Sequence, residues 1–194
     1  MPQLYLVAGL GNPGERYEKT RHNAGAAVVA KLADSTHVSL RRVKSCMTLA
    51  CEAEIGGAPT VLSFPQTYMN ESGRAVVCLM KRYPEAVVNS LVVIHDELDL
   101  PVGVVKIKRG GGLAGHNGLK SIASYAGSKD FIRVRVGIGR PRDGVDISRW
   151  VLSRPDANER IQLELATERA AMAVQSIVRD GVEKAMNEFN SNTR

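Results

Sequence analysis

The sequence has few cysteines and no long apolar run, and each shortage narrows the classes of protein to which it can belong. It contains three cysteines among 194 residues. This odd number does not make a disulfide framework and favours a reducing cytoplasm. No stretch approaches the roughly 18 consecutive apolar residues that a membrane span requires. Residues 1–7 lack a basic region, and the first apolar run is interrupted at Gly9, so we expect no signal peptide. A secreted or membrane protein is therefore not predicted.

Motifs of several common enzyme classes are also absent. There is no internal repeat or low-complexity stretch, and no G-x-S-x-G elbow supports a serine hydrolase. The glycine-rich segment 109–118 lacks the Walker spacing, so NTP binding is not expected. The four histidines show neither H-E-x-x-H spacing nor paired cysteines, and the sequence predicts no metal centre. They are His22, His37, His95 and His116.

The composition is that of a globular protein with an anionic partner. Hydrophobic residues make up 44% and charged residues 24% of the chain, which argues against disorder. A length of 194 residues supports one hydrophobic core, or at most two. Lys and Arg number 26 against 20 Asp and Glu, a net charge of +6. This moderate excess favours a partner such as nucleic acid.

Short apolar runs alternate with segments of helical periodicity. The runs 4–10 and 91–95 are typical of strands buried on both faces. Segments 49–55 and 60–64 flank a Gly-Gly-Ala-Pro turn and predict a hairpin. Helices are expected at 24–34, 72–83, 116–125 and from 155 to a terminator at Gly181. This order predicts a single α/β domain, residues 1–194, with a mixed twisted sheet and helices packed on both faces.

Two further strands carry basic side chains on alternate positions. Lys106 and Lys108 share one face of the strand 104–108, and Arg133 and Arg135 share one face of the strand 133–136. If both strands lie at one sheet edge, these side chains form a positive band. For Lys106 and Arg133, an ordinary solvated surface is the alternative.

A G-x-G-x-x-G pattern at 9–14 follows the first strand and raises the possibility of a dinucleotide site. Pro13 removes one amide from the phosphate cradle and pushes Asn12 out of the helical region. The polar stretch 15–22 has no apolar periodicity where a Rossmann helix should pack, and Asp34 ends a helix, not a second strand. The sequence therefore disfavours an NAD-dependent oxidoreductase.

Polar residues gather where predicted strands end and helices begin. His95-Asp96-Glu97 directly follows a buried strand, a position where α/β folds place chemistry, although a capped turn explains it equally. His116 and Asn117 stand at a predicted helix N-terminus, where free amides and polar side chains can meet a ligand. A flexible turn is the alternative for that loop.

Three asparagines stand in loops beside glycine, proline or a helix start. Asn12, Asn70 and Asn117 are each typical of a turn or a cap. Together with His22 and Asp96 they would instead form a polar pocket suited to activating water and holding amides. The sequence leaves both interpretations open.

Four blocks of the sequence resemble the bacterial-type peptidyl-tRNA hydrolases. They read GLGNPGERYEKTRHNAG at 9–25, FPQTYMNESG at 64–73, HDELDLPVG at 95–103 and GGGLAGHNG at 110–118. The blocks have the order and spacing of that family, and the likeness covers nearly the whole chain, thinning after about residue 150. The resemblance implies a single α/β domain that hydrolyses the ester between a peptide and the terminal ribose of tRNA.

The resemblance also implies roles for individual residues. His22 matches the catalytic histidine and Asp96 its partner, with no metal or organic cofactor. The matching active-site asparagines are Asn12, Asn70 and Asn117, and the matching cleft-lining residues are Tyr17, Tyr68 and Met69. An imidazole can take a proton from water. A carboxylate can stabilise the imidazolium, and amide groups can donate to the developing oxyanion.

The sequence departs from the common family pattern at a few positions. Leu113-Ala114 replaces a more polar or glycine-rich pair, and Tyr68 stands where phenylalanine is frequent. Gly144 occupies a position where some relatives carry a lysine that contacts the tRNA. We expect Arg140 or Arg142 to substitute for it.

The remaining expectations concern partners. We expect Lys108 and Arg135 to contact the tRNA backbone, and His116 to bind substrate beside Asn117. The expected partner is the acceptor stem and terminal ribose of peptidyl-tRNA, met by a cytoplasmic monomer. A tRNA-binding module without activity is the alternative, and turnover of peptidyl-tRNA would distinguish the two.

Overall fold

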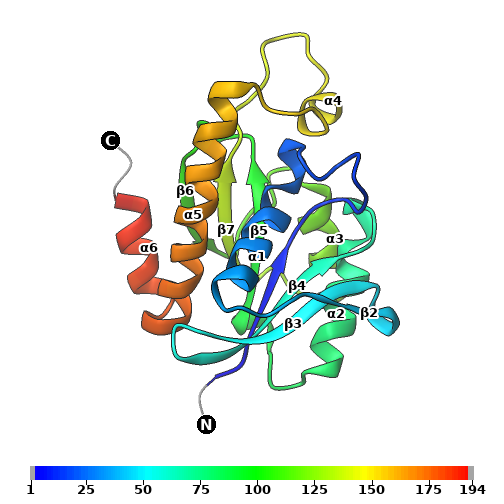
Figure 1. The fold of residues 1–194 in the computed structure, drawn as a ribbon, viewed down its shortest axis with the longest axis vertical. Coiled ribbons are helices and arrows are strands. Elements are labelled where there is room, and N and C mark those ends of the chain that lie inside the picture. Colours follow the sequence, from blue (N-terminus) through cyan, green and yellow to red (C-terminus); the bar gives the residue numbers. More distant parts are fainter. Residues whose placement is uncertain (1–2, 192–194) are drawn as a thin grey trace.

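A seven-stranded mixed sheet forms the centre of the computed structural model, which describes residues 3–191 (Figure 1). The strand order is β2-β3-β4-β1-β5-β7-β6. The strands are β1 (Tyr5–Gly9), β2 (Arg41–Val43), β3 (Thr48–Ile55), β4 (Ala58–Pro65), β5 (Leu91–Glu97), β6 (Val105–Arg109) and β7 (Ile132–Gly137).

The central strands are parallel, and antiparallel strands complete both edges. β1 pairs in parallel with β4 and β5, and β5 pairs in parallel with β7. β3 and β6 add antiparallel to β4 and β7, respectively. The carboxyl ends of the parallel strands therefore meet at one edge of the sheet, where ligands bind in folds of this class.

The predicted helices are present, and shorter elements accompany them. The α-helices of the described residues are α1 (Ala24–Ser35), α2 (Ser72–Arg82), α3 (Asn117–Ala126), α4 (Ile147–Val151), α5 (Ala157–Asp180) and α6 (Val182–Ser191). The 3-10 segments are η1 (Arg21–Asn23), η2 (Lys44–Cys46), η3 (Met69–Glu71) and η4 (Val88–Ser90). The long helix predicted from residue 155 begins at Ala157 because Asp156 and Glu159 form a capping box.

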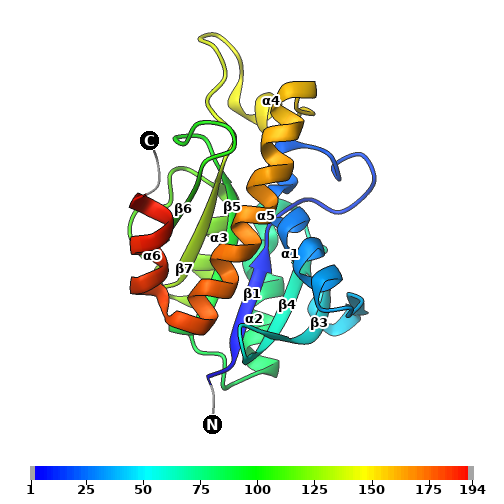
Figure 2. The ribbon, with the colours of Figure 1, turned by 60° about the vertical axis from the view of Figure 1, so that its left-hand side comes forward.

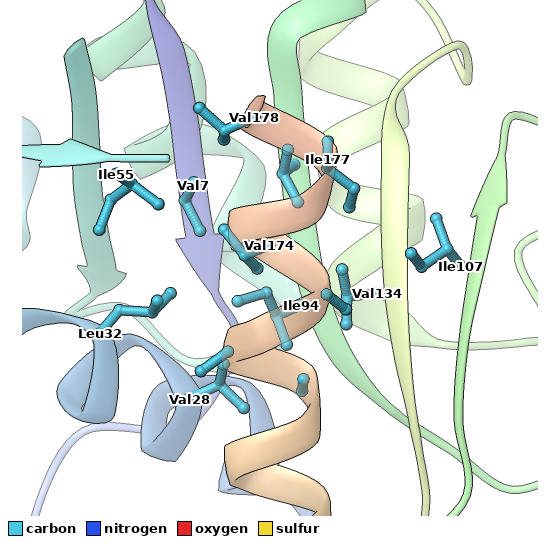
Figure 3. Packing of buried hydrophobic residues seen from close by; sticks show 14 of the residues in the cluster. Val7, Val28, Leu32, Ile55, Ile94, Ile107, Val134, Val174, Ile177 and Val178 are labelled. Atoms are coloured by element: carbon cyan, nitrogen blue, oxygen red, sulfur yellow. The ribbon is translucent and has the colours of Figure 1, made fainter. Parts of the chain in front are cut away.

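Helices cover both faces of the sheet, as predicted. On one face, Val28 of α1 and Val174 and Ile177 of α5 pack against Val7 and Ile94 of the central strands (Figure 3). Figure 2 shows α5 and α6 along this face and α2 and α3 behind the sheet. Each fully buried Val, Leu or Ile side chain contributes about 1.5–3 kcal/mol to the free energy of unfolding. This packing fixes the sheet edge that carries the polar residues.

The structure corrects one expectation about cysteine. Cys46 and Cys78 form a disulfide across 32 residues of sequence, while Cys51 is free. The expectation that three cysteines make no disulfide framework did not foresee this single bond. Contact between η2 and α2 brings the two residues together, and their sequence spacing gave no sign of it.

Two further points concern the whole chain. None of the helices within residues 3–191 combines the length and apolarity that a bilayer crossing needs. The extension of the domain over 1–194 stays a prediction, because residues 1–2 and 192–194 lie outside the described part.

Candidate active site

Polar segments follow the carboxyl ends of the parallel strands. β1 leads to Asn12, β4 leads to Met69, and Asp96 is the penultimate residue of β5. α4 and the loop before it stand beyond this end of the sheet (Figures 1 and 2). Residues from distant parts of the sequence therefore meet at one edge.

His22 and Asp96 form the central contact of this edge. Nδ1 of His22 lies 2.9 Å from Oδ1 and 3.0 Å from Oδ2 of Asp96. The His22 side chain is 12% exposed and that of Asp96 only 2%. Since a carboxylate accepts hydrogen bonds, Nδ1 carries the proton and Nε2 keeps its lone pair.

A glycine allows the helix that follows His22 to contact the sheet. A Cβ on Gly25 would lie 2.2 Å from the carbonyl oxygen of Ile94 and 2.5 Å from the amide nitrogen of Leu10. No larger residue fits there without moving backbone. The first turn of α1 therefore rests directly on β5, and His22 lies beside Asp96.

The electrostatics of the site favour an ionised Asp96. Burial alone would raise the pKa of this carboxyl, but the imidazoles of His22 and His116 and their hydrogen bonds hold the pKa well below its usual range. Complete burial, the largest cause, lowers the pKa of His95 to about 3. His95 is therefore neutral at pH 7, and its Nδ1 donates to the backbone carbonyl of Asp96 at 2.7 Å.

His116 also contacts the carboxylate. Its Nε2 lies 3.0 Å from Oδ1 of Asp96, and its ring centroid lies 5.1 Å from that of His22. His116 is the N-cap of α3, with Asn117 as the first residue of that helix. Both residues that the sequence singled out in this loop are therefore at the site.

Asn12 is held by backbone and side-chain hydrogen bonds on both sides. Its Oδ1 accepts from the amide of Met69 at 2.8 Å. Asn23 accepts from the Asn12 amide and donates to the Asn12 carbonyl, each at 2.9 Å. Asn12 and Met69, which belong to separate sequence blocks, are thus in direct contact. Sequence reasoning missed Asn23, and its position next to His22 was the one available signal.

A pocket of about 190 Å³ opens at His22. Its wall includes His22, Asp96, His116 and Asn117, with Ile147 and Val151 contributed by α4. Sequence reasoning did not predict α4, because a five-residue helix is too short to show periodicity. Among the described residues, no serine or cysteine side chain hydrogen bonds to His22.

Other predicted cleft residues lie outside that pocket wall. Tyr68 is 65% exposed, and Asn70 is exposed on η3. Tyr17 is half-buried, with the Arg16 guanidinium 5.7 Å from its ring centroid. Among the described residues, no hydrogen bond joins Asn70 to His22.

Of the basic residues expected to contact tRNA, two are exposed without a described carboxylate partner and two pair with carboxylates. Lys108 and Arg142 are exposed. Nε of Arg135 donates to Glu97 at 3.0 Å, and Nε of Arg140 donates to Asp99 at 2.8 Å. These four basic residues remain the candidate tRNA contacts.

Arg133 departs from the predicted band. Its exposed fraction is 1%, so neither a positive surface nor a solvated side chain describes it. Its guanidinium donates to the carbonyls of Gly112, at 2.7 Å, and Gly110. The glycine-rich loop folds over β7 and buries this arginine.

Arg21 connects several segments, a role that sequence reasoning missed. Its buried guanidinium donates to Ser153 at 2.6 Å and pairs with Glu159. Its Cζ lies 3.7 Å from the ring centroid of Trp150. Arg21 therefore joins the segment before His22 to α4 and to the start of α5.

The cluster of His22, Asp96 and His116 has the spacing of a possible metal site. Donor atoms of His22, Asp96 and His116 all lie within 4.8 Å of one another. The hydrogen bonds from both imidazoles to one carboxylate account for this spacing.

Fold and site together define a hydrolase-type α/β protein, in which a histidine oriented by a buried carboxylate can activate water. The family model described as peptidyl-tRNA hydrolase matches residues 6–194. This chain belongs to the peptidyl-tRNA hydrolase family, as its sequence blocks predicted. The dinucleotide-binding alternative is not retained, since α1 starts only at Ala24, well beyond the glycine pattern.

Individual relatives agree with this assignment. Peptidyl-tRNA hydrolase of Syntrophotalea carbinolica is 45% identical over 188 residues, covering 97% of each chain. That of Frankia casuarinae is 46% identical over 187 residues, covering 96% of this chain and 94% of its own. The crystal structure of the Acinetobacter baumannii enzyme superposes with a TM-score of 0.91 at 38% identity, covering 98% of this chain and 96% of its own.

Proposed function

We propose that His22 is the general base with which this member of the peptidyl-tRNA hydrolase family hydrolyses the ester between peptide and tRNA. The contact of His22 Nδ1 with both oxygens of buried Asp96 carries the proposal. It leaves Nε2 as the atom that accepts a proton from water. The water oxygen then attacks the ester carbonyl.

Asp96 and the asparagines stabilise the charges that this attack creates. The Asp96 carboxylate stabilises the imidazolium of His22. Amide groups of Asn12, Asn70 and Asn117 donate to the oxyanion or hold the substrate, and one such donor contributes about 3–4 kcal/mol in known cases. The imidazolium then returns its proton to the leaving ribose oxygen. Free tRNA and the peptide acid are the products.

The Asn12 side chain is a candidate for selecting blocked substrates. A peptidyl ester carries an amide where an aminoacyl ester carries a charged amine. Because Oδ1 of Asn12 is engaged by Met69, its NH₂ group is the part available to substrate. Asn12→Asp should improve relative activity on free aminoacyl-tRNA, since a carboxylate attracts the amine. An unchanged ratio of the two activities would reject this role.

We propose that basic residues form the tRNA-binding surface, with Lys108 beside the glycine-rich loop and Arg135 leading toward Arg140 and Arg142. Lys108 and Arg142 are exposed, whereas Arg135 and Arg140 also pair with carboxylates. We propose that Lys108, Arg135 and either Arg140 or Arg142 contact the acceptor stem. Each phosphate contact removed should flatten the slope of log K against log salt by roughly 0.7–0.9. If Arg140→Ala and Arg142→Ala both leave the slope unchanged while Lys108→Ala alters it, neither arginine replaces the lysine absent at Gly144.

The enzyme is proposed to act as a cytoplasmic monomer, without a metal or organic cofactor. The decisive experiment measures release of N-acyl amino acid from N-acyl-aminoacyl-tRNA, with and without EDTA. His22→Ala should lower kcat by about 10²–10⁴-fold and leave tRNA affinity unchanged. His37→Asn is the matched control, because His37 has a positive φ that Asn tolerates. Retention of more than about a tenth of kcat in His22→Ala, or tRNA binding without turnover by the native protein, would overturn the proposal.

A further inference from the structure

His116 uses both of its ring nitrogens. Nδ1 accepts from the backbone amide of Gly118 at 3.1 Å and from that of Leu119 at 3.4 Å. Nε2 lies 3.0 Å from Oδ1 of Asp96. The side chain is only 7% exposed. Both hydrogen-bonding positions of the ring are thus occupied by protein groups.

These partners define which tautomer is present. A backbone N–H only donates, so Nδ1 of His116 has no proton. A carboxylate only accepts, so Nε2 carries the proton. His116 is therefore a neutral imidazole that donates to Asp96. It has no lone pair left for water and no N–H left for substrate, which differs from the substrate-binding role expected from the sequence.

A histidine is an uncommon residue for this position. Ser, Thr, Asp and Asn are the preferred N-caps, because their short side chains accept from the first helical amides. His116 performs that function and also reaches Asp96. A Cβ on Gly118 would lie 3.2 Å from Cε1 of His116 and 2.6 Å from Sδ of Met69. The glycine therefore gives the imidazole room to fold over the start of α3.

We propose that His116 is a positioning residue that joins the N-terminus of α3 to the carboxylate of Asp96. The proposal rests on the general-base role of His22 given above. Through its cap, His116 orients Asn117, the first residue of the helix. Through Nε2, it shares Oδ1 of Asp96 with His22 and so limits how strongly the carboxylate holds the imidazolium.

The charged and titratable groups around Asp96 come from several elements. His95 precedes it on β5, and Arg135 of β7 pairs with buried Glu97. Arg140, which pairs with Asp99, lines the same pocket. These groups are unchanged in the variants below, so a difference between variants reports on His116.

Two substitutions separate the two functions of His116. His116→Asn keeps an N-cap acceptor but is too short to donate to Asp96. His116→Phe keeps an aromatic ring of similar shape but has no ring nitrogens, so it loses both interactions. In both variants, the carboxylate has one donor fewer and holds the His22 imidazolium more strongly. The acid limb of the kcat/KM profile should therefore move to higher pH by about one unit. Only His116→Phe should also lower the melting temperature by loss of the cap.

Several results would overturn the proposal. An unmoved acid limb in both folded variants would do so, as would an increase in KM alone, which indicates substrate binding. A ¹⁵N spectrum of the histidine rings at pH 7 gives a readout without activity, and a protonated Nδ1 at His116 would contradict the tautomer. Full activity in His22→Ala would instead reject the proposed function, so the two failures are distinguishable.

Discussion

Replacing Asp96 by asparagine tests the contact on which the mechanism depends. The asparagine side chain presents one acceptor and one NH₂ donor where the carboxylate presents two acceptors. His116 Nε2 contacts Oδ1 alone, whereas His22 Nδ1 lies 2.9 Å and 3.0 Å from the two oxygens. If the amide oxygen stays with His116, the NH₂ group faces His22. His22 must then accept through Nδ1 and carry its proton on Nε2, where the base is needed.

The expected loss follows from that change of tautomer. The equivalent substitution in a serine-protease triad lowers kcat about 10⁴-fold, and general-base catalysis as a whole contributes about 10²–10⁴-fold. We expect Asp96→Asn to lower kcat by a factor within that range. Such a decrease corresponds to an increase of about 3–5 kcal/mol in the activation free energy. KM for N-acyl-aminoacyl-tRNA should change little.

Single-turnover release of the N-acyl amino acid measures the effect directly. Asp34→Asn, at an exposed position near the end of α1, is the matched control. A folded Asp96→Asn protein with a kcat within about threefold of the native value would refute the reasoning, because the base would then not need the carboxylate.

Three predictions concern stability. Ala114 has a φ of +48°, so Ala114→Gly should stabilise by about 0.5–1 kcal/mol, seen as a higher melting temperature; a decrease would contradict this. Without reductant the unfolded chain should titrate one thiol, Cys51, and Cys78→Ser should cost about 3–4 kcal/mol; three thiols would disprove the disulfide. Unfolded His95 takes up a proton below about pH 6.5, but folded His95 does so only near pH 3. Stability should therefore decrease as the pH is lowered from about 6.5 to about 3, and the decrease should be smaller in a folded His95→Phe variant.

The regular elements could be predicted because their patterns are local. The apolar runs of β1 and β5 and the periodicity of α2 depend only on neighbouring residues. Gly181, which ends α5, was likewise visible in the sequence. α4 was not, because a short helix over a pocket is stabilised by contacts such as that of Arg21 with Trp150, which join residues far apart in the chain.

The candidate site could be proposed in part from its residue types and in part from the resemblance. Acidic and amide residues at the strand ends indicated where chemistry would lie, and the family blocks assigned His22 and Asp96. Neither source predicted Asn23, whose two bonds to Asn12 exist only in the folded chain. The Cys46–Cys78 pair was missed for the same reason.

Arg133 and Lys108 show why a period of two does not separate a surface from a core. They are paired across β6 and β7 and face the same side of the sheet, yet one is buried and the other exposed. The difference comes from the glycine-rich loop, whose carbonyls at Gly110 and Gly112 accept from Arg133. A buried guanidinium must find such acceptors, and backbone carbonyls supply them without a carboxylate. The glycine-rich loop before α3 is thus held by Arg133 and, at its end, by His116. The position of the Asp96 carboxylate, the proposed partner of the base, and that of the loop therefore depend on each other.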